Sequence, residues 1–552
     1  MLEELDAASS LLSDALNTYI GVCSTARSLC LQEVAQNSGR VQDLSDAEQV
    51  KTQLQLVNSY QEKLRRARAS LRVVLNSSPT VAPINALPTK IMLRIFNFVT
   101  SRKPGAIGEK HHSSTCRPRY LDILAHVCSR WRQIALASPT LWSHIDLAYH
   151  HQLDQGLVAR AKEYVTRAHR LPLNIHIVDT YSDYHTVPVD IDDLNFLPPD
   201  TPISSLELVS YHSFYNPHFI ALGHCFKNCV PGQLKQLTIW CRSDPQGGFL
   251  ESTERPKQPN TPQLDVSESH LEAVLAQISV LQLNGLCFRW TSKAYHNLVD
   301  LRLHFDLTYL PNMITIPESQ LVEIMKSSPR LRIFHACLEI TDPLPIDSPV
   351  LPVRLDDLEV FHLQTGLWGK STTFVRWIEP GTKPLRLSIG SSPSEQLDRF
   401  FARSNVTRLC LLYPGRNSLN YILSLVPQLR VLILDNYTNE GSGKRSFASR
   451  MVPARISEPE FNLQLEVNLQ LEVLYLIGGR IGRKILRQLV EWHSVRRLVI
   501  WKTMIVQDDS AHKVLDIPGL HQELSSCPEF KYYTEKSPDP TSNWDDLDGL
   551  CY

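Results

Sequence analysis

The sequence lacks the features that mark a secreted, membrane-spanning or strongly charged protein. Its 552 residues carry 56 basic and 57 acidic side chains, and a net charge of −1 provides no overall field that would attract nucleic acid or an anionic membrane. The stretch Met1 to Asp6 is acidic and lacks the basic start and apolar core of a signal peptide. No segment approaches the roughly twenty apolar residues of a bilayer-spanning helix. We therefore expect neither nucleic acid nor a membrane as a partner.

Paired cysteines are also absent. The 12 cysteines are scattered, mostly among apolar residues and with no Cys-x-x-Cys pair, so we expect reduced thiols in a cytoplasmic or nuclear protein. His224, Cys225, Cys229 and Cys241 could be drawn as a zinc site, but no second spaced pair completes it. Buried thiols are the favoured interpretation there, and we expect no metal.

Catalytic signatures are missing as well. The sequence contains no His-Glu-x-x-His, Gly-x-Ser-x-Gly or dinucleotide-binding glycine pattern. Gly443-Lys444 looks like the end of a phosphate-binding loop, but Thr438 stands where a glycine is required and Arg445 where a magnesium-binding hydroxyl is required. We expect no cofactor and no enzymatic activity. An enzyme with its site in the loops at strand ends is one alternative.

The first 75 residues are predicted to be helical, because proline is absent before Pro79 and Leu, Ala, Gln, Glu and Arg dominate. Ser38-Gly39 marks a turn between two helices. The second helix carries apolar residues spaced by three and four, close to a heptad seam: Val50, Leu54, Val57, Tyr60, Leu64, Ala67, Leu71 and Val74. Residues 1–75 are therefore either a helical hairpin packed on itself or a coiled coil that self-associates through residues 44–75. Residues 76–83 have the composition of a linker.

Residues 84–147 are predicted to form three short helices. Pro88 occupies a first helical position, where a proline is tolerated, and Ile91, Ile95 and Val99 then share one face at i, i+4 and i+8. A second amphipathic helix carries Leu121, Leu124, Val127, Cys128, Trp131 and Ile134. Ser138-Pro139 starts a third helix, which carries Leu141 and Trp142. A unit of this size is too small to bury all its apolar side chains alone.

These residues resemble an F-box: Leu87-Pro88, Val127-Cys128 with Trp131-Arg132, and Leu141-Trp142 stand in the family's order. The resemblance implies docking on the Skp-type linker of a cullin (SCF) ubiquitin ligase. The docking set that it implies is Leu87, Pro88, Ile91, Ile95, Val127, Cys128, Trp131, Leu141 and Trp142. Two features depart from the family: Lys90 stands where an acidic residue is usual, and a polar insertion spans residues 101–118.

A second pattern recurs from about Leu173 onward, in which one aliphatic residue is followed by others three and five positions later. Its copies begin at Ile203, Leu234, Ile278, Leu298, Leu331, Leu358, Val406, Leu429, Leu471 and Val495, with a weaker copy at Pro384. Residues two apart on a strand share a face, and stacking successive copies buries that face in a parallel sheet. This pattern resembles leucine-rich repeats. An unrelated α/β domain with parallel strands is the alternative.

The predicted fold class is α+β with an α/β repeat: N-terminal helices (1–75), a linker (76–83), a three-helix F-box (84–147), an irregular leucine-rich-repeat-like solenoid with a parallel sheet (148–530), and a disordered acidic tail (531–552). The whole arrangement resembles F-box proteins of fungal type. It implies a non-enzymatic adaptor that docks a Skp-type linker, and through it a cullin, at the F-box and an unknown target protein at the repeats. A repeat-based interaction scaffold that is independent of the ligase is the alternative, and Lys90 and the insertion motivate it.

Overall fold

The computed structural model describes residues 2–35, 44–78, 80–100, 121–148, 154–179, 196–210, 213–241, 248–254, 262–304, 314–345, 348–364, 370–390, 394–412, 416–435, 460–461, 469–506, 517–533, 537, 539–541 and 544. The chain divides into two compact units, Met1–Pro88 and Thr89–Tyr552. Each unit is described by itself. The polar insertion at residues 101–118 lies outside the described residues.

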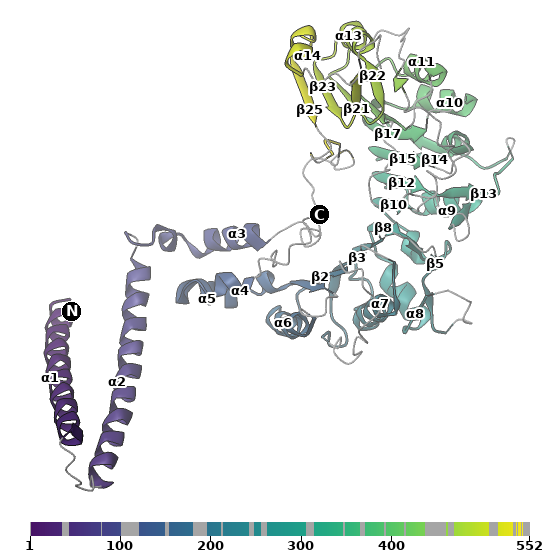
Figure 1. Ribbon diagram of the computed structural model, residues 1–552. Helices are drawn as coiled ribbons and strands as arrows, with labels where there is room; N and C mark the ends of the chain where they lie inside the picture. Colours follow the sequence, from purple (N-terminus) through teal and green to yellow (C-terminus); the bar gives the residue numbers. More distant parts are fainter. Residues whose placement is uncertain are drawn as a thin grey trace. The chain divides into compact units, whose positions relative to one another are not determined.

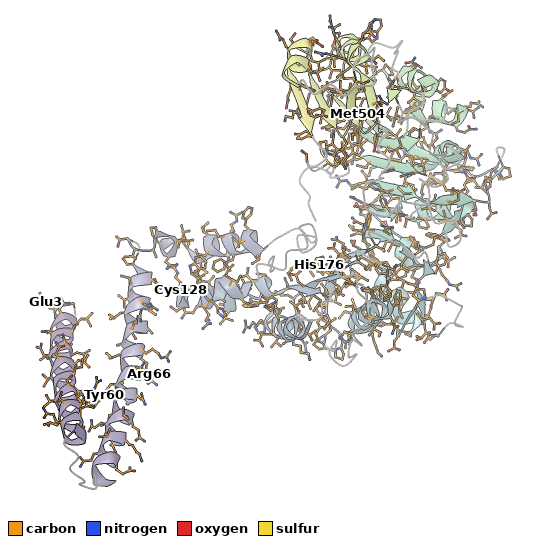
Figure 2. The ribbon with its side chains drawn as sticks, in the orientation of Figure 1. Glu3, Tyr60, Arg66, Cys128, His176 and Met504 are labelled. Atoms are coloured by element: carbon orange, nitrogen blue, oxygen red, sulfur yellow. The ribbon has the colours of Figure 1, made fainter. Side chains whose placement is uncertain are left out.

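The first unit consists of two long helices and a short helical turn. Helices α1 (Leu2–Ala35) and α2 (Leu44–Ser77) are each 34 residues long and lie side by side in opposite directions, followed by the 3-10 helix η1 (Pro83–Ala86) (Figure 1). The Tyr19 hydroxyl on α1 donates a hydrogen bond of 3.1 Å to Oε1 of Gln53 on α2. Where burial is described in these two helices, Tyr19 and Glu62 are half-buried and every other side chain is exposed. Figure 2 shows Tyr60 and Arg66 projecting from α2.

The second unit begins with short helices that lead into a sheet. These are α3 (Thr89–Thr100), α4 (Leu121–Ala125), α5 (Ser129–Leu136) and η2 (Pro139–Trp142), followed by strand β1 (His144–Ala148) and helix α6 (Asp154–Arg167). The single helix predicted from Leu121 to Ile134 is therefore wrong, because the backbone of Cys128 is extended and caps a new helix. Its sulfur accepts a hydrogen bond of 3.5 Å from the Trp131 N–H.

The core of the second unit is a 14-stranded sheet in which each neighbouring pair is parallel. After β1 its strands are β2 (Leu173–Asp179), β3 (Ile203–Ser210), β4 (Gln236–Cys241), β8 (Val280–Asn284), β10 (Asp300–His304), β12 (Ile333–Cys337), β15 (Val360–Gln364), β17 (Leu385–Gly390), β18 (Val406–Leu412), β19 (Val431–Asp435), β21 (Val473–Ile477), β23 (Arg497–Trp501) and β25 (Glu529–Tyr533). The strands follow one another in chain order, as stacked repeats require.

Helices connect the strands and lie along one side of the sheet (Figure 1). They are α7 (Asn216–Asn228), α8 (Glu268–Leu275), η4 (Lys293–Tyr295), α9 (Glu318–Ser327), η6 (Lys370–Trp377), α10 (Glu395–Arg403), α11 (Arg416–Ser424), α13 (Arg483–Trp492) and α14 (Ile517–Glu523). Short parallel strands form five small sheets: β5 (Gly248–Phe249) with β9 (Leu286–Cys287), β6 (Glu251–Ser252) with β7 (Gln263–Leu264), β11 (Thr315–Pro317) with β13 (Glu339–Thr341), β14 (Val353–Leu355) with β16 (Ile378–Pro380), and β20 (Glu460–Phe461) with β22 (Arg480–Gly482) and β24 (Met504–Val506).

The aliphatic pattern sets the register of the sheet. Leu409 pairs with Leu432 and Leu411 with Leu434, and all four side chains are fully buried on the helical side. The residues between and beside these leucines point the other way, since alternate side chains of a strand face opposite sides. We call this second side the open face. Helices followed by a long parallel sheet are thus confirmed.

Two predicted boundaries differ from the structure. The predicted end of the three-helix unit at residue 147 falls inside β1, which pairs with β2 as the first strand of the sheet. The predicted tail begins at residue 531, yet β25 continues to Tyr533 and pairs with β23. Beyond β25, Ser537 and Trp544 make hydrogen bonds to the sheet, so the prediction of disorder is wrong at these described positions.

Candidate functional site

Helix α3 has two apolar stripes, which lie roughly a third of a turn apart around the helix. Met92 and Phe96 are fully buried and form its inner side. Ile91 is 40% exposed and Phe98 is 83% exposed, so these side chains form an outer side. Ile95 and Val99, which were predicted to share a face with Ile91, are half-buried, so this face is only partly covered. A helix with two apolar stripes has one stripe left to cover after the domain has folded.

The inner side of α3 packs on the tryptophan of α5. The rings of Phe96 and Trp131 lie 5.0 Å apart at an angle of 54°, which is a favourable tilted arrangement. Trp131 is half-buried, so part of its ring remains accessible beside the buried Phe96. Trp131 therefore belongs to both the core and the surface.

Leu141 and Trp142 lie in the core rather than on the surface. They are 5% and 0% exposed, and the Trp142 indole donates a hydrogen bond of 2.8 Å to the carbonyl of Ala135. The Trp142 ring also meets Tyr164 edge-on at 4.9 Å, and the Arg167 guanidinium lies 4.4 Å from its centre. A direct contact of Leu141 or Trp142 with a partner therefore does not fit this structure. They support the helices instead.

A polar cluster ties α4 to α6. Asp122 accepts hydrogen bonds from the Arg160 Nε at 2.7 Å and from the Tyr164 hydroxyl at 3.0 Å. Burial and the charge of Asp122 raise the pKa of Tyr164, so its hydroxyl remains a donor. This cluster fixes the short helices to the start of the array, because α6 also packs on β1.

The remaining predicted docking residues differ in exposure. Val127 is 55% exposed, whereas Ile95 and Cys128 are half-buried, and Cys128 serves as the cap of α5. Leu87 and Pro88 belong to the first unit, where the Leu87 N–H caps η1 by donating to the Ile84 carbonyl at 3.2 Å. In that unit Leu87 is half-buried and Pro88 is exposed.

Three exposed apolar residues were missed by the sequence analysis. Phe98 on α3, Ile123 on α4 and Leu136 on α5 are 83%, 57% and 44% exposed. Phe98 stands seven residues after Ile91, which is the same helical face two turns later, so the spacing contained the signal. We define the α3 outer strip as Ile91, Ile95 and Phe98.

The α3 outer strip forms a shallow groove with polar edges. Its lining residues are Ile91, Arg94, Ile95, Asn97 and Phe98. Such a surface offers apolar contact with a polar rim, which is the composition of a protein-docking site rather than of a catalytic one.

Comparison with known families identifies this region. Residues 84–148 match the family model described as F-box-like. The chain carries an F-box-like domain. The resemblance in the Leu-Pro, Trp-Arg and Leu-Trp motifs is thereby confirmed at the level of the domain. F-box domains generally bind Skp-type linkers in SCF complexes. A search of the curated proteins finds no match to the chain.

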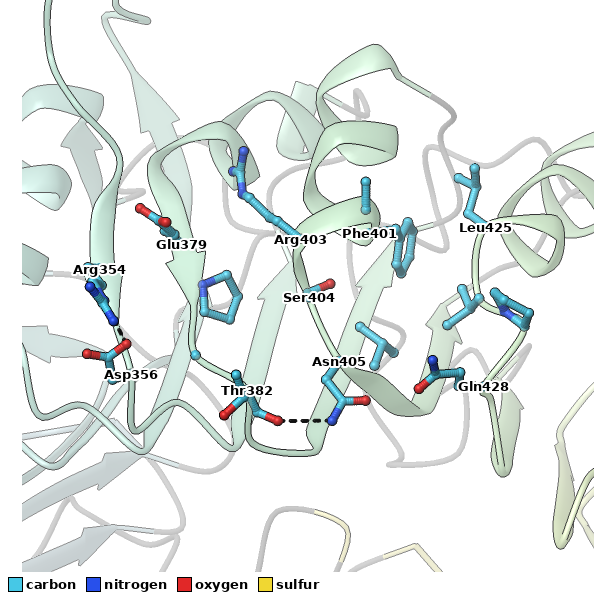
Figure 3. A pocket seen from close by; sticks show the side chains of 16 residues that line it. Arg354, Asp356, Glu379, Thr382, Phe401, Arg403, Ser404, Asn405, Leu425 and Gln428 are labelled. Carbon is cyan, nitrogen blue, oxygen red and sulfur yellow. Dashed lines mark hydrogen bonds and ion pairs between the residues drawn. The ribbon is translucent and has the colours of Figure 1, made fainter.

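A second concave site lies in the array, on loops that precede β17, β18 and β19 (Figure 3). This cleft has a volume of about 940 Å³. Arg403 at its wall donates to the carbonyls of Val375, Arg376 and Ile378, and Arg354 pairs with Asp356 at 2.8 Å. No histidine is among its described lining residues, and these cations are engaged in holding loops. Its described carboxylates are Asp356, which is paired with Arg354, and Glu379.

The cysteines considered for zinc are buried thiols. Cys225, Cys229 and Cys241 are between 0% and 2% exposed, and burial raises the pKa of Cys229 to about 11. Burial raises the pKa of Cys225 further, so both stay protonated and unreactive. Within the described residues, no group of three or more metal-ligating side chains is brought together. None of the described helices combines the length and apolarity that crossing a membrane requires.

Proposed function

We propose that the chain is the target-recognition adaptor of an SCF-type ubiquitin ligase. The F-box-like domain would dock a Skp-type linker, and through it a cullin, while the array binds a target protein. The observation that carries the proposal is the α3 outer strip, which exposes Ile91 and Phe98 beside a complete domain core. Proteins with this domain are typically adaptors rather than enzymes, which supports a non-enzymatic role.

The energetics of the α3 outer strip favour docking. Covering an exposed Phe side chain gains about 1.5–3 kcal/mol, and Phe98 is 83% exposed, so it can deliver most of that gain. Arg94 and Asn97 at the groove edge can form polar contacts at the rim of an interface. A few such anchors usually supply most of the free energy of an interface.

The array is proposed to be of the leucine-rich-repeat type and to hold the target. Its repeats stack in chain order, which gives a long continuous face. An adaptor needs no catalytic residues, because tethering raises the effective concentration of a target lysine near the enzyme that carries ubiquitin. The free cysteines among the described residues support a reducing compartment, and we propose the cytoplasm or nucleus.

The test is co-purification of a recombinant Skp-type linker with the tagged full chain. We expect Phe98→Asp and Ile91→Asp each to weaken linker binding at least about ten-fold, because a charge would be buried in an apolar contact. Leu351→Asp is the matched control: Leu351 is 79% exposed, almost as much as Phe98, but lies in the array. It should bind as the wild type does. Unchanged binding of both α3 variants would refute the docking assignment.

The ligase-independent scaffold makes a different prediction in the same experiment. Lys90 is exposed at the position where the family usually has an acidic residue, and in this alternative the reversed charge removes linker affinity. A wild-type chain that fails to retain the linker, while Lys90→Glu restores binding, would favour the scaffold.

We further propose that the first unit self-associates through residues 44–75. The described side chains of α2 are exposed apart from the half-buried Glu62, although Leu64 and Leu71 stand seven residues apart on its apolar seam. Long helices gain most of their stability from packing such a seam. Light scattering should give a dimer of the 62.8 kDa chain, and Leu64→Asp should give a monomer. Leu351→Asp should stay dimeric. A monomeric wild type at micromolar concentration would exclude the proposal.

A further inference from the structure

The open face changes character along the sheet. In its first strands the residues between the two core aliphatics are polar: His176, Glu207, Thr238, Gln282, Arg302, His335 and His362. At the same position β18, β19 and β21 carry Cys410, Ile433 and Tyr475, and these side chains belong to a large apolar cluster on the open face. Its members are Cys410, Leu412, Ile433, Tyr475, Ile477, Trp501 and Tyr533. Cys410, Ile433, Ile477 and Trp501 are between 1% and 8% exposed although they point away from the helices, so this part of the open face is a contact surface.

The C-terminal segment lies on this cluster. Trp544 packs against it, and its indole Nε1 donates a hydrogen bond of 3.0 Å to the Ser388 hydroxyl on β17. The Arg386 guanidinium donates to the backbone carbonyl of Trp544 at 3.1 Å. Nearer to β25, the Trp501 indole donates to the carbonyl of Ser537 at 3.0 Å. The segment is thus fixed at two points that lie on different strands.

Trp544 is held as a peptide ligand is held in a binding site, by apolar packing, a side-chain hydrogen bond and a main-chain hydrogen bond. Ser388 is 2% exposed, so its hydroxyl is a buried acceptor placed at the end of an apolar cluster. It accepts the one hydrogen bond that a tryptophan side chain can donate. The Arg386 guanidinium donates a hydrogen bond to the main-chain carbonyl of Trp544. The seat, which we define as Arg386, Ser388 and the seven-residue cluster, therefore recognises an indole together with its main chain.

The segment is also preorganised. The Asp539 carboxylate accepts hydrogen bonds from the N–H of Thr541 at 2.7 Å and from its hydroxyl at 2.6 Å. An Asp that bonds the backbone two residues later closes a local turn, which lowers the entropy lost when the segment is ordered. Arg386 is in register with Arg408 on the open face, and this pair of cations favours an acidic ligand.

We propose that the seat is the target-binding site of the array, that it takes a tryptophan-containing acidic peptide of a target protein, and that the chain's own tail occupies it as an internal competitor. This assignment of the target class rests on the proposed adaptor function. Because the tail is tethered, its effective concentration at the seat is of millimolar order. A target peptide must displace it, so the tail sets a threshold for capture.

The first experiment uses the full chain and a fluorescein-labelled synthetic peptide of residues 535–548. Removing the internal competitor with Trp544→Ala should tighten peptide binding about ten-fold or more, if the peptide binds with a Kd near 0.1 mM against a tail at about 1 mM. Trp492→Ala on α13, where the side chain is 52% exposed, is the control and should bind as weakly as the wild type. A peptide with alanine in place of its tryptophan should not bind either chain.

The seat itself is tested by adding Ser388→Ala to the Trp544→Ala chain, which should weaken peptide binding about five-fold through loss of the indole acceptor. A second measurement needs no variant. Excess peptide added to the wild-type chain should raise the hydrogen exchange of residues 537–544 as the tail is displaced. Equal affinity of the wild-type and Trp544→Ala chains, equal binding of the alanine peptide, or unchanged exchange would overturn the proposal.

Linker co-purification with the Trp544→Ala chain separates this inference from the proposed function. A chain that retains the linker but shows no peptide binding would refute the seat alone. A chain that binds the peptide but not the linker would refute the ligase role and leave the peptide site standing.

Discussion

Three stacked histidines make the stability of the array depend on pH. His304, His335 and His362 stand on the neighbouring strands β10, β12 and β15, and His304 Nε2 lies 3.1 Å from His335 Nδ1. The His335 and His362 ring centres are 5.3 Å apart. Burial lowers the pKa of His362 to about 4 and that of His304 to about 3, with a further contribution from its neighbours His362 and Arg302. Burial likewise lowers the pKa of His335.

The direction in which stability changes with pH depends on whether the folded or the unfolded state binds more protons. Unfolded histidines titrate near pH 6.5, so below that pH the unfolded chain takes up protons that these folded sites refuse. The full stability is present above pH 6.5 and is lost progressively as the pH falls toward 4. For His362 alone, pH 5 lies about 1.5 units below the pKa of the unfolded state, and folding loses about 2 kcal/mol of stability at that pH. The lowered pKa values of His304 and His335 add to this loss in the same direction.

The assay is hydrogen exchange of β10, β12 and β15 between pH 7.5 and pH 5, after correction for the intrinsic exchange rate, because repeat arrays open locally. His362→Phe keeps a ring in the stack but removes one titrating group, so its protection should fall by about 2 kcal/mol less than that of the wild type. His296→Gln changes an exposed histidine and should follow the wild type. If His362→Phe lost protection as steeply as the wild type, the assignment of the pH dependence to this stack would be wrong.

Three further substitutions test the packing described above. Trp131→Ala should cost about 2–3 kcal/mol in unfolding experiments, because only about half of a side chain that buries up to roughly 250 Å² is lost from the core, and it should also reduce linker binding. Trp142→Ala removes a fully buried ring and should cost about 3–5 kcal/mol, so melting of the domain should precede any loss of docking; stability equal to that of Trp131→Ala would contradict its placement. The buried Glu318 carboxylate accepts hydrogen bonds from Arg376 at 2.9 Å and from the Leu344 N–H. Arg376→Ala leaves this carboxylate without its cation and should lower the free energy of unfolding by about 3–5 kcal/mol. Replacing both Glu318 and Arg376 by leucine should recover most of that loss, as measured by urea titration.

The sequence was sufficient to predict the strands but not the ends of the array. Residues such as Leu432 and Leu434 repeat at fixed offsets, and their positions in register set the parallel sheet. β25 was missed because Phe530 and Tyr532 replace the aliphatic pair at its core positions. The tail was predicted as disordered from its polar, acidic composition. A few specific contacts, above all those of the half-buried Trp544, outweigh that composition, and a composition averaged over a segment does not reveal the contacts of one side chain.

The candidate docking site shows a different limit. The motifs located the F-box-like helices, but α3 carries two apolar stripes, and helical periodicity fits Ile91 and Ile95 as well as Met92 and Phe96. Which stripe is buried depends on the partner helix that supplies Trp131, and this pairing is not encoded in the spacing of α3 itself. The resemblance placed Leu141 and Trp142 in the docking set because it gives the order of the motifs but not the burial of each side chain, and both are core residues.

Both proposed binding surfaces share a feature that can be sought in a sequence. Each is a second apolar stripe on an element whose core stripe is already complete. On α3 the core stripe contains Phe96, and Phe98 belongs to the surplus one. On β19 the core leucines flank Ile433, which stands where earlier strands carry histidine or another polar residue. Folding alone gives no reason to keep an apolar residue at such a position, because it gains nothing there until something covers it. Within this chain Trp544 of the tail packs against the cluster that contains Ile433, and an equivalent cover for Phe98 must come from a partner if the docking proposal is correct.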